Sequence, residues 1–471
     1  MLLVVLVVLV LLLTCFNLCK SQSTPNPINT TIAGIIETCY AFLEQHLCTG
    51  TKWDYDYHFY RPALEKYSAD QWLWDSGSHM IVNSHRNVTN SILDMRSLLH
   101  MQQPSGFIPE EIFWSKKSIK ENAEILLEYS NDKFTDITQM PVLPYSLRAM
   151  AQAIDDVNDK NNVIKEFLYP LVNYFKWWRL QRDLGDGLVV AIHNWETGLD
   201  ASPAYDPAFH VYITELNETA FHELYPKFVE LVESYNLFYH WDTSKILDRS
   251  KTREKHLDKW FVVKDVGLNS VYANGWKVLA DLAQLIGDDN TASECNREYK
   301  TSRDAIIKKM FITEQGRFNT LYVDNDGKEK ASIANTIQNL FPLLLYDLPI
   351  SYVNIIVADV ANENKFMSPF ALSTVAMDDN QFSATFDVDL MWRGPVWGFT
   401  NWFVMEGLGL HNELDIQKKI LDKWIALVQT SGIYEHYNPL TGSPYGPPGL
   451  GMSTLIVDWI YRFGYDKNPP F

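Results

Sequence analysis

Residues 269–286 read NSVYANGWKVLADLAQLI and are followed by Gly287. Apolar side chains recur at helical spacing through this stretch, and a glycine directly after such a pattern is a common helix stop. The same pattern returns in residues 143–157, 163–181, 292–311, 333–345, 396–408 and 414–430. The sequence therefore predicts an all-α fold.

Three long loops separate these predicted helices. They cover residues 183–206, 366–394 and 434–451, and they are rich in glycine, proline, aspartate and aromatic residues. Long irregular loops in a compact domain usually carry function. Many helices joined by alternating short and long loops suit an α/α toroid, in which paired helices surround a central cleft. No low-complexity linker interrupts residues 21–471, so we expect them to form a single domain.

The composition narrows the class of partner. The chain has 471 residues and a formal net charge of −18. Nucleic-acid binding needs a basic surface, so this charge excludes a nucleic-acid partner, and it also argues against an anionic membrane surface. The 15 Trp, 24 Tyr and 24 Phe residues provide flat apolar faces that can pack in a core or stack on ligand rings. An acidic chain suits a neutral substrate, and no feature favours a particular oligomeric state.

The N-terminal segment predicts entry into the secretory pathway. Residues 1–19 are nearly all apolar and are followed by Lys20 and a polar stretch. This pattern is typical of a signal peptide over residues 1–20, with an uncleaved membrane anchor as the alternative. Either reading places the chain outside the cell or in the lumen of the secretory pathway. Three glycosylation sequons agree with this location, at Asn29, Asn87 and Asn217.

Five cysteines are present, and two of them lie in the apolar N-terminal segment. Cys39 and Cys48 are close in sequence, so we expect them to form a disulfide in an oxidising compartment. Cys295 then stays unpaired, as a small buried hydrophobic residue. No zinc-binding spacing and no cofactor motif is found, so we expect neither a metal nor a cofactor.

The loop QWLWDSG, residues 71–77, places Trp72 three positions before Asp75. The two side chains share a face if this segment is helical. An indole ring can stack on a pyranose while the neighbouring carboxylate accepts hydrogen bonds from its hydroxyls. The alternative is a buried tryptophan beside an aspartate that caps a helix.

The loop HNWETGLDASP, residues 193–203, holds two carboxylates around a glycine. Gly198 and Pro203 prevent a plain helix here. A carboxylate in an irregular aromatic loop can be partly desolvated, which raises its pKa, as a general acid requires. The alternative is that Asp200 caps a helix and Glu196 lies on the surface.

Two later loops add aromatic and charged residues. In residues 387–398, Trp392, Arg393 and Trp397 could line a pocket, and the arginine could bind a carboxylate of the substrate or of the protein. In residues 434–442, Glu435 lies among tyrosines before an Asn-Pro turn, where an exposed, hydrogen-bonded carboxylate could act as a base. A solvated loop glutamate is the alternative.

Taken together, these segments resemble a known family. The blocks QWLWDSG, TQMPVLPYSL, RDLGDGL, HNWETGLDASP, MWRGPVW, NWFVMEGL and YEHYNPLTG are similar to glycoside hydrolase family 63. They are most similar to its single-domain branch, which includes mannosylglycerate and glucosylglycerate hydrolases. The resemblance runs from about Tyr67 to Phe463. It implies an (α/α)6 barrel and hydrolysis, with inversion, of an α-linked glucose or mannose from a small glycoside or oligosaccharide.

The resemblance also implies roles for individual residues. Asp200 matches the general acid and Glu435 the general base of the family. The positions that match the sugar pocket are Trp72, Asp75, Gln139, Trp392 and Trp397; we add Arg393 and Tyr437 from the same loops. An inverting pair leaves room for a water molecule, so its carboxyl groups are expected roughly 6.5–9.5 Å apart.

Several positions depart from the family pattern. They are Thr197, Ala201, Met391 and the pair Ala204–Tyr205. None removes a catalytic carboxylate, but together they leave the leaving-group subsite undefined. Three alternatives therefore stay open. One is another α/α-toroid glycosidase of the trehalase or glucoamylase kind. The second is a non-catalytic secreted carbohydrate-binding protein, and the third is a structural scaffold.

Overall fold

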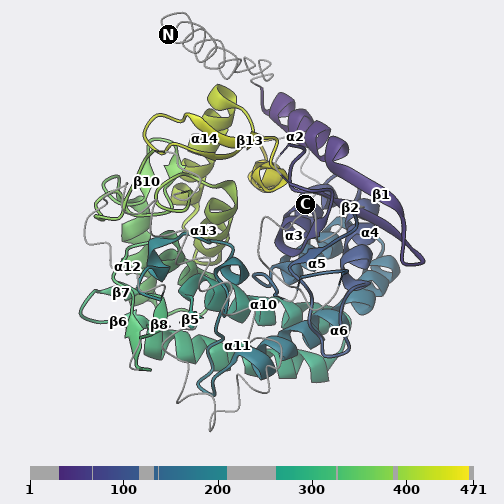
Figure 1. Ribbon diagram of the computed structural model, residues 1–471, viewed down its shortest axis with the longest axis horizontal. Coiled ribbons are helices and arrows are strands. Elements are labelled where there is room, and N and C mark those ends of the chain that lie inside the picture. The colour runs from purple at the N-terminus through teal and green to yellow at the C-terminus, as the bar shows by residue number, and fades with distance from the viewer. Residues whose placement is uncertain are drawn as a thin grey trace, which may run out of the picture.

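The computed structural model describes residues 31–65, 67–115, 132–135, 137–208, 261–324, 327–385 and 391–465. The predicted signal segment, Asn29, Asn217 and residues 386–390 of the second long loop lie outside these ranges. Figure 1 shows the helices arranged as a ring, with the first described helix beside the last ones. The predicted all-α toroid is confirmed.

The first quarter of the ring is built from short helices and paired strands. Its elements are α2 (Ile32–His46), β1 (Leu47–Lys52), β2 (Tyr55–Tyr60), β3 (Gln71–Trp72), α3 (Leu73–Ser84), α4 (Val88–Leu99) and β4 (Glu111–Ile112). Strands β1 and β2 form an antiparallel hairpin, and β3 pairs antiparallel with β4. The β3–β4 pair brings Trp72 opposite Glu111, which fixes the point where α3 begins.

The middle of the ring contains the longest helices. Its elements are α5 (Leu143–Ala153), α6 (Val157–Arg182), the 3₁₀ turns η1 (Asn194–Thr197) and η2 (Pro203–Tyr205), β5 (Val263–Lys264), α10 (Val266–Leu285), α11 (Asp289–Ala305) and the π-helical turn η4 (Ile306–Met310). Helix α10 begins where Asp265 caps it by accepting a hydrogen bond from the backbone of Leu268. Nearly all of α10 is buried, so it forms the inner wall at this point of the ring.

The final part of the ring ends in a hairpin and a short helix. Its elements are β6 (Phe311–Ile312), β7 (Arg317–Phe318), β8 (Leu321–Val323), β9 (Glu329–Ala331), η5 (Ile337–Leu344), α12 (Ile350–Ala361), β10 (Met367–Ser368), β11 (Ala371–Leu372), α13 (Gly398–Leu410), α14 (Leu414–Ser431), β12 (Tyr434–Tyr437), β13 (Pro444–Pro448), η7 (Gly451–Leu455) and α15 (Ile456–Arg462). The strands form small antiparallel pairs, apart from the three-stranded sheet β5–β8–β9.

The predicted helices differ from the observed ones in two places. Within residues 333–345 only Ile337–Leu344 are helical, and they form a 3₁₀ helix instead of an α-helix, because Pro342 lies inside it and cannot donate a backbone hydrogen bond. The segment 143–157 ends as a helix at Ala153, and Asp156 then caps the start of α6 by accepting from the backbone of Asn158 and Asp159.

A buried charge cluster joins the two ends of the ring. Glu406 on α13 is 3% exposed and accepts hydrogen bonds from Arg148 on α5, at 2.6 Å, and from Arg462 on α15. Asp458 on α15 pairs with His85, which directly follows α3, at 2.8 Å. Burial of unpaired charges is costly, so the buried carboxylates of Glu406 and Asp458 depend on these partners.

The main core is a connected cluster of buried apolar side chains that runs along the chain from Ile35 to Tyr461, and a small second cluster contains Val190, Ile192 and Val262. Among the described residues, no helix combines the length and the apolar character that a membrane crossing would need.

The predicted disulfide is wrong. Cys39 and Cys48 are both free thiols, as is Cys295. About 10 Å of helix separates Cys39 from His46 at the end of α2, whereas a disulfide needs Cα atoms within about 7 Å. Cys39 is fully buried, and the thiol of Cys48 lies 3.5 Å from the backbone carbonyl of His46.

Candidate active site

Asp200 lies in an irregular loop between the 3₁₀ turns η1 and η2. Gly198 has a φ of +71°, and a side chain there would collide with the indole of Trp74. The loop therefore turns sharply against the start of α3. The amide of Asn194 donates to the backbone carbonyl of Asp200 at 3.2 Å. As predicted, no regular helix runs through this loop, so Asp200 does not cap one.

A buried ion pair fixes the loop that carries Asp200. The Arg182 guanidinium, at the end of α6, donates to Glu196 at 2.9 Å, and the two side chains are 1% and 0% exposed. The other carboxylate oxygen of Glu196 accepts from the backbone of Ile192 at 2.9 Å. The alternative that Glu196 lies on the surface is wrong. The glutamate fixes the loop that carries Asp200.

Glu435 lies on β12 at a break in the strand pairing. The register of β12 against β13 shifts between Tyr434, which pairs with Pro448, and His436, which pairs with Tyr445, so the extra residue lies in β13 opposite Glu435. Beside this irregularity the Glu435 side chain points inward and is only 1% exposed. The expectation of an exposed carboxylate is therefore wrong. Gly446, with φ of +70°, lies directly against the Glu435 carboxylate, where no side chain would fit.

Tyr67 contacts this carboxylate directly. Its hydroxyl donates to Oε1 of Glu435 at 2.7 Å. Burial, the negative charge of Glu435 and the hydrogen bond to it raise the pKa of Tyr67 well above its usual value, so the hydroxyl keeps its proton. The negative charge of Asp200 is the smallest of the influences that raise this pKa. The sequence analysis did not single out Tyr67.

Asp75 lies in the first turn of α3 and is 3% exposed. Burial, together with the negative charge of Glu435, raises its pKa to about 8. Asp75 is therefore protonated at neutral pH, and a protonated carboxyl can donate a hydrogen bond as well as accept one.

Trp72 and Trp74 remain partly exposed beside these carboxylates. The ring of Trp72 meets that of Tyr67 edge-on, with 6.1 Å between centroids. Trp74 is tilted against Trp392 at 6.4 Å. These two indoles therefore keep part of their surface available to a ligand.

Trp392 and Trp397 are buried in a stack of three rings. Trp397 lies between Trp392, at 3.9 Å, and His436, at 4.6 Å, with both neighbours nearly parallel to it. Both faces of Trp397 are therefore covered. The stack connects the loop before α13 to the hairpin that carries Glu435.

Two more of the predicted pocket residues, Arg393 and Tyr437, form hydrogen bonds within the protein. The Arg393 guanidinium is fully buried and donates to Asp206 and, at 3.1 Å, to Gln381. This ion pair within the chain joins the loop that carries Trp392 to the end of the loop that carries Asp200. The Tyr437 hydroxyl donates to the carbonyl of Gly432 at 2.8 Å and accepts from the backbone of Tyr434 at 2.8 Å. It shapes the hairpin beside Glu435.

Gln139 lies directly under α3. Its side-chain oxygen Oε1 accepts a hydrogen bond from the backbone N–H of Trp74 at 3.1 Å, and its side-chain nitrogen Nε2 donates to Oε1 of Glu110 at 3.3 Å. Glu110 is buried and is a second residue that the sequence analysis missed, since nothing in a PEE segment distinguishes a buried glutamate from a solvated one. No group of residues suited to a metal occurs within the described ranges.

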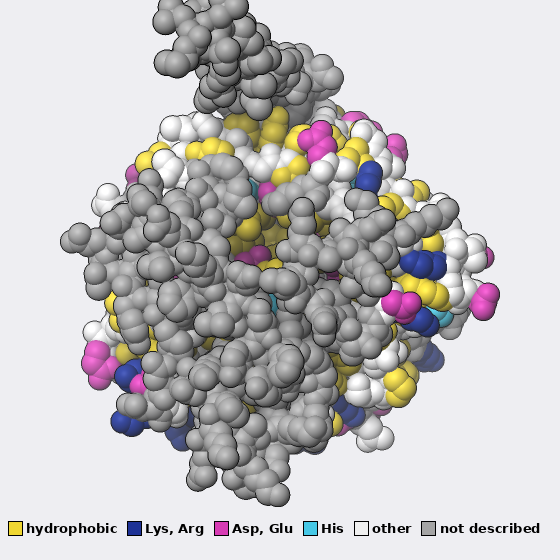
Figure 2. All heavy atoms as spheres, viewed as in Figure 1, with side chains coloured by type: hydrophobic (Ala, Val, Ile, Leu, Met, Phe, Trp, Pro, Cys, Tyr) yellow, Lys and Arg dark blue, Asp and Glu magenta, His cyan; other side chains and the backbone are white. Residues whose placement is uncertain are grey.

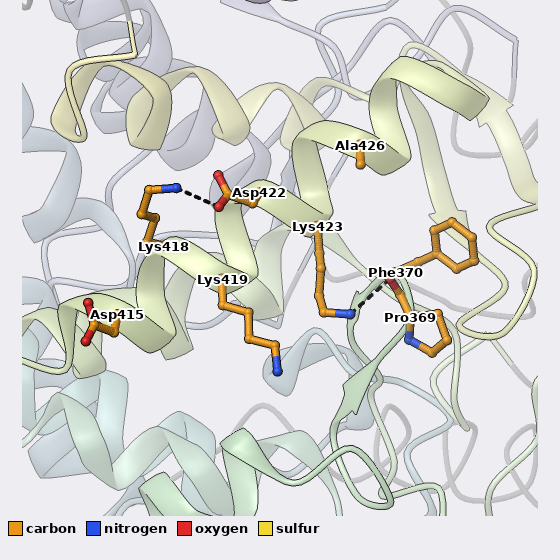
Figure 3. Close-up of a pocket in the computed structure, with 8 residues that line it drawn as sticks. All are labelled: Pro369, Phe370, Asp415, Lys418, Lys419, Asp422, Lys423 and Ala426. Carbon is orange, nitrogen blue, oxygen red and sulfur yellow. Dashed lines mark hydrogen bonds and ion pairs between the residues drawn. The ribbon is translucent and has the colours of Figure 1, made fainter.

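Figure 2 shows hydrophobic and acidic side chains together at the centre of the face seen in Figure 1, among the atoms that are described. A separate, shallow hollow of about 390 Å³ lies on the outer surface along α14 (Figure 3). Its three lysines are all engaged. Lys418 pairs with Asp422 at 2.7 Å, Lys419 pairs with Glu363 at 2.8 Å, and Lys423 donates to backbone carbonyls. None of the proposed catalytic residues lines this hollow.

Comparison with known proteins decides the family. The domain family described as "Mannosylglycerate hydrolase MGH1-like glycoside hydrolase domain" matches residues 67–453, most of the chain. The chain belongs to this family of glycoside hydrolases.

Relatives of this glycoside hydrolase agree. It is 26% identical over 408 residues to mannosylglycerate hydrolase MGH1 of Selaginella moellendorffii, covering 83% of this chain and 80% of the relative. It is 25% identical over 417 residues to the mannosylglycerate hydrolase of Thermus thermophilus, covering 82% of this chain and 93% of that one.

The fold of this glycoside hydrolase matches a solved structure of the same kind. A family 63 mannosylglycerate hydrolase from Thermus thermophilus, in complex with glucose, superposes with a TM-score of 0.73 at 21% identity, covering 90% of this chain and 99% of that one. The expected resemblance to family 63 and the (α/α)6 barrel are confirmed.

Proposed function

We propose that this glycoside hydrolase cleaves an α-linked glucose or mannose from a small glycoside or oligosaccharide, with inversion at the anomeric carbon. Asp200 is the general acid and Glu435 the general base. The observation that carries the proposal is the hydrogen bond that the Tyr67 hydroxyl donates to Glu435 at 2.7 Å. The negative charge of Asp200 also contributes to the raised pKa of Tyr67.

The loop around Asp200 supports the assignment of this residue as the general acid. A glycosidic oxygen leaves poorly until it is protonated, so the acid must hold a proton and release it at the right position. The loop around Asp200 is fixed by Gly198 and by the buried Arg182–Glu196 pair. A rigid loop keeps the proton donor within reach of the scissile bond.

Glu435 supports the base role. In its ionised form it takes a proton from a water molecule that attacks the opposite face of the anomeric carbon. The Tyr67 hydroxyl occupies one carboxylate oxygen and holds the group in place. Beside Gly446 and the irregularity in β13, its side chain points inward.

Asp75, Trp72 and Trp74 support recognition of a sugar ring. A neutral Asp75 can donate to one sugar oxygen and accept from another hydroxyl. The partly exposed indoles provide apolar faces for the ring. The relatives include mannosylglycerate hydrolases and a glucosylglycerate hydrolase, so a mannosyl or glucosyl conjugate of glycerate is the first substrate to try.

The test is a screen read by proton NMR from the first minutes of reaction. The panel contains α-glucosides and α-mannosides, including glycerate conjugates, disaccharides and glucosylated N-glycans. We expect hydrolysis of at least one member, with the β-anomer of the released sugar appearing first. Initial release of the α-anomer would contradict the inverting mechanism. Binding without turnover would favour the alternative of a non-catalytic carbohydrate-binding protein.

We also propose that the protein is a glycoprotein of the secretory pathway, secreted or retained in its lumen, because residues 1–20 have the pattern of a signal peptide. Asn87 supports this, since it is exposed at the start of α4. Expression in a eukaryotic cell line should give a chain that begins after the apolar segment and shortens with N-glycosidase treatment. An intact, unglycosylated N-terminus in the cytosol would contradict it.

A further inference from the structure

Glu110 is held rigidly beside the start of α3. Its backbone carbonyl accepts from Leu73 at 2.8 Å, and its backbone N–H donates to Ile137 at 2.8 Å. The side chain is 1% exposed. Both neighbouring peptide groups are thus fixed by the framework that also positions Trp72, Trp74 and Asp75. The place of the Glu110 carboxyl is set by the fold and not by solvent.

One oxygen of Glu110 fixes the orientation of Gln139. The amide oxygen of Gln139 faces the backbone N–H of Trp74, at 3.1 Å, and the amide nitrogen faces Oε1 of Glu110, at 3.3 Å. The two ends of an amide differ in hydrogen-bonding capacity, so these two contacts allow only one orientation. The amide nitrogen of Gln139 keeps a second hydrogen for another acceptor.

The second oxygen of Glu110 is buried and has no hydrogen-bond partner among the residues that the structure describes. An unpartnered buried polar atom is costly, and a hydrogen bond to a bound ligand would recover part of that cost. Burial, followed by the negative charges of Glu111, Asp200 and Glu196, raises the pKa of Glu110 well above its usual value. Burial beside these carboxylates therefore favours the protonated form of Glu110, in which the carboxyl can donate a hydrogen bond.

We propose that Glu110 is a specificity-determining residue, which holds the Gln139 amide with one oxygen and presents the other, as a hydrogen-bond donor, to a hydroxyl oxygen of the bound sugar. This inference rests on the proposed function and extends it to the acid side of the site. Glu110 and Gln139 together offer two donors, whereas a carboxylate there would offer only acceptors and would add a charge beside Asp200.

Two substitutions separate donation from charge. Glu110→Leu removes both hydrogen bonds, so we expect kcat/KM to fall by about tenfold or more, mainly through a higher KM, because such a contact exists before the transition state. Glu110→Gln keeps an oxygen for Gln139 and a donor for the sugar, and should recover most of that loss. Glu363→Leu and Glu363→Gln, at an exposed surface ion pair, are the matched controls and should behave as the wild type.

A set of monodeoxy analogues of the best substrate supplies the deciding readout. The wild type should lose about as much kcat/KM on one analogue as Glu110→Leu loses on the parent sugar. Glu110→Leu should be insensitive to that same deletion. A purely structural role for Glu110 would leave the two effects additive, and would overturn the proposal.

Two further outcomes would also overturn it. One is an unchanged KM in a folded Glu110→Leu variant. The other is a Glu110→Gln variant as impaired as Glu110→Leu, since that result would mean that the charge of Glu110 is needed. Infrared difference spectra between the wild type and Glu110→Gln test the protonation of Glu110 without turnover. We expect the C=O band of a protonated carboxyl in the wild type and its loss in the variant. If the wild type hydrolyses nothing on the panel, the proposed function fails, whereas the infrared band and calorimetric binding of the deoxy sugars still decide the role of Glu110.

Discussion

The Tyr67 hydroxyl donates a 2.7 Å hydrogen bond to Oε1 of Glu435, although 368 positions separate the two residues in the chain. Hydrogen bonds to charged groups are worth about 1.5–3 kcal/mol. We expect Tyr67→Phe to lower kcat by about tenfold or more through loss of base alignment. Tyr169→Phe is the control, because Tyr169 is 45% exposed and contacts Asp288 outside the site. Equal kcat values for the two variants would remove Tyr67 from the catalytic site.

Substitution of the proposed acid and base tests the mechanism itself. Asp200→Asn and Glu435→Gln each keep side-chain size but abolish proton transfer, so each should lower kcat by at least about a hundredfold. Steady-state kinetics on the best substrate, with circular dichroism to verify folding, measures the effect. A folded variant with near-normal turnover would reject the role assigned to that residue.

Gly446 gives a test of how tightly Glu435 is packed. Any side chain at Gly446 would enter the space of the Glu435 carboxylate. Gly446→Ala should therefore reduce kcat by about tenfold or more. Gly287→Ala is a matched control, because Gly287 has a similar φ of +75° but no atom within 4 Å of an added Cβ. Both variants should lose about 1 kcal/mol of stability from backbone strain, and only the first should lose activity.

The Arg182–Glu196 pair predicts a large loss of stability. Arg182→Met leaves a buried, unpaired carboxylate under the Asp200 loop, which typically costs about 3–5 kcal/mol. Arg96→Met breaks a salt bridge in which the side chains are 47% and 37% exposed, and should cost less than about 1 kcal/mol. Guanidinium unfolding curves of the two variants compare them. A similar loss in the free energy of unfolding for both variants would mean that burial of the Arg182–Glu196 pair does not increase its contribution to stability.

Asp94 predicts a pH-dependent stability. Its Oδ1 accepts from Ser76 and Gln71 at 2.8 Å each, and burial raises its pKa to about 8. An unfolded chain releases this proton near pH 4, while the folded chain keeps it up to about pH 8. The free energy of unfolding should therefore fall with rising pH in this window, by up to about 1.4 kcal/mol per pH unit from Asp94 alone. The Asp94→Asn variant should show a flatter dependence, and parallel curves would contradict the assignment.

The sequence was sufficient for the helices and for the fold class. Local apolar spacing predicts α10 and α14 closely, because their buried faces and their ends depend on nearby residues. The family motifs also predict which loops lie at the site. The free thiols of Cys39 and Cys48 show where proximity in sequence misleads, since a helix separates residues that are only nine positions apart.

The details of the site depend on contacts between distant segments. Glu435 is buried beside an irregularity in a two-stranded hairpin, and such irregularities have no reliable signature in a single sequence. Tyr67, Arg182 and Glu110 act through partners far away in the chain or through burial. Their roles therefore become visible only when the ring is complete.

The cluster of Glu406, Asp458 and Arg462 has a consequence for biosynthesis. Its members on α13 and α15 pair with Arg148 and His85, which leave the ribosome some 250 or more residues earlier. The ring therefore cannot close until the last helix has been made, and much of the apolar inner wall stays uncovered until then. Folding dominated by such late, long-range contacts is slow and prone to aggregation. Chains truncated before α15 should consequently depend on chaperones and accumulate in insoluble form.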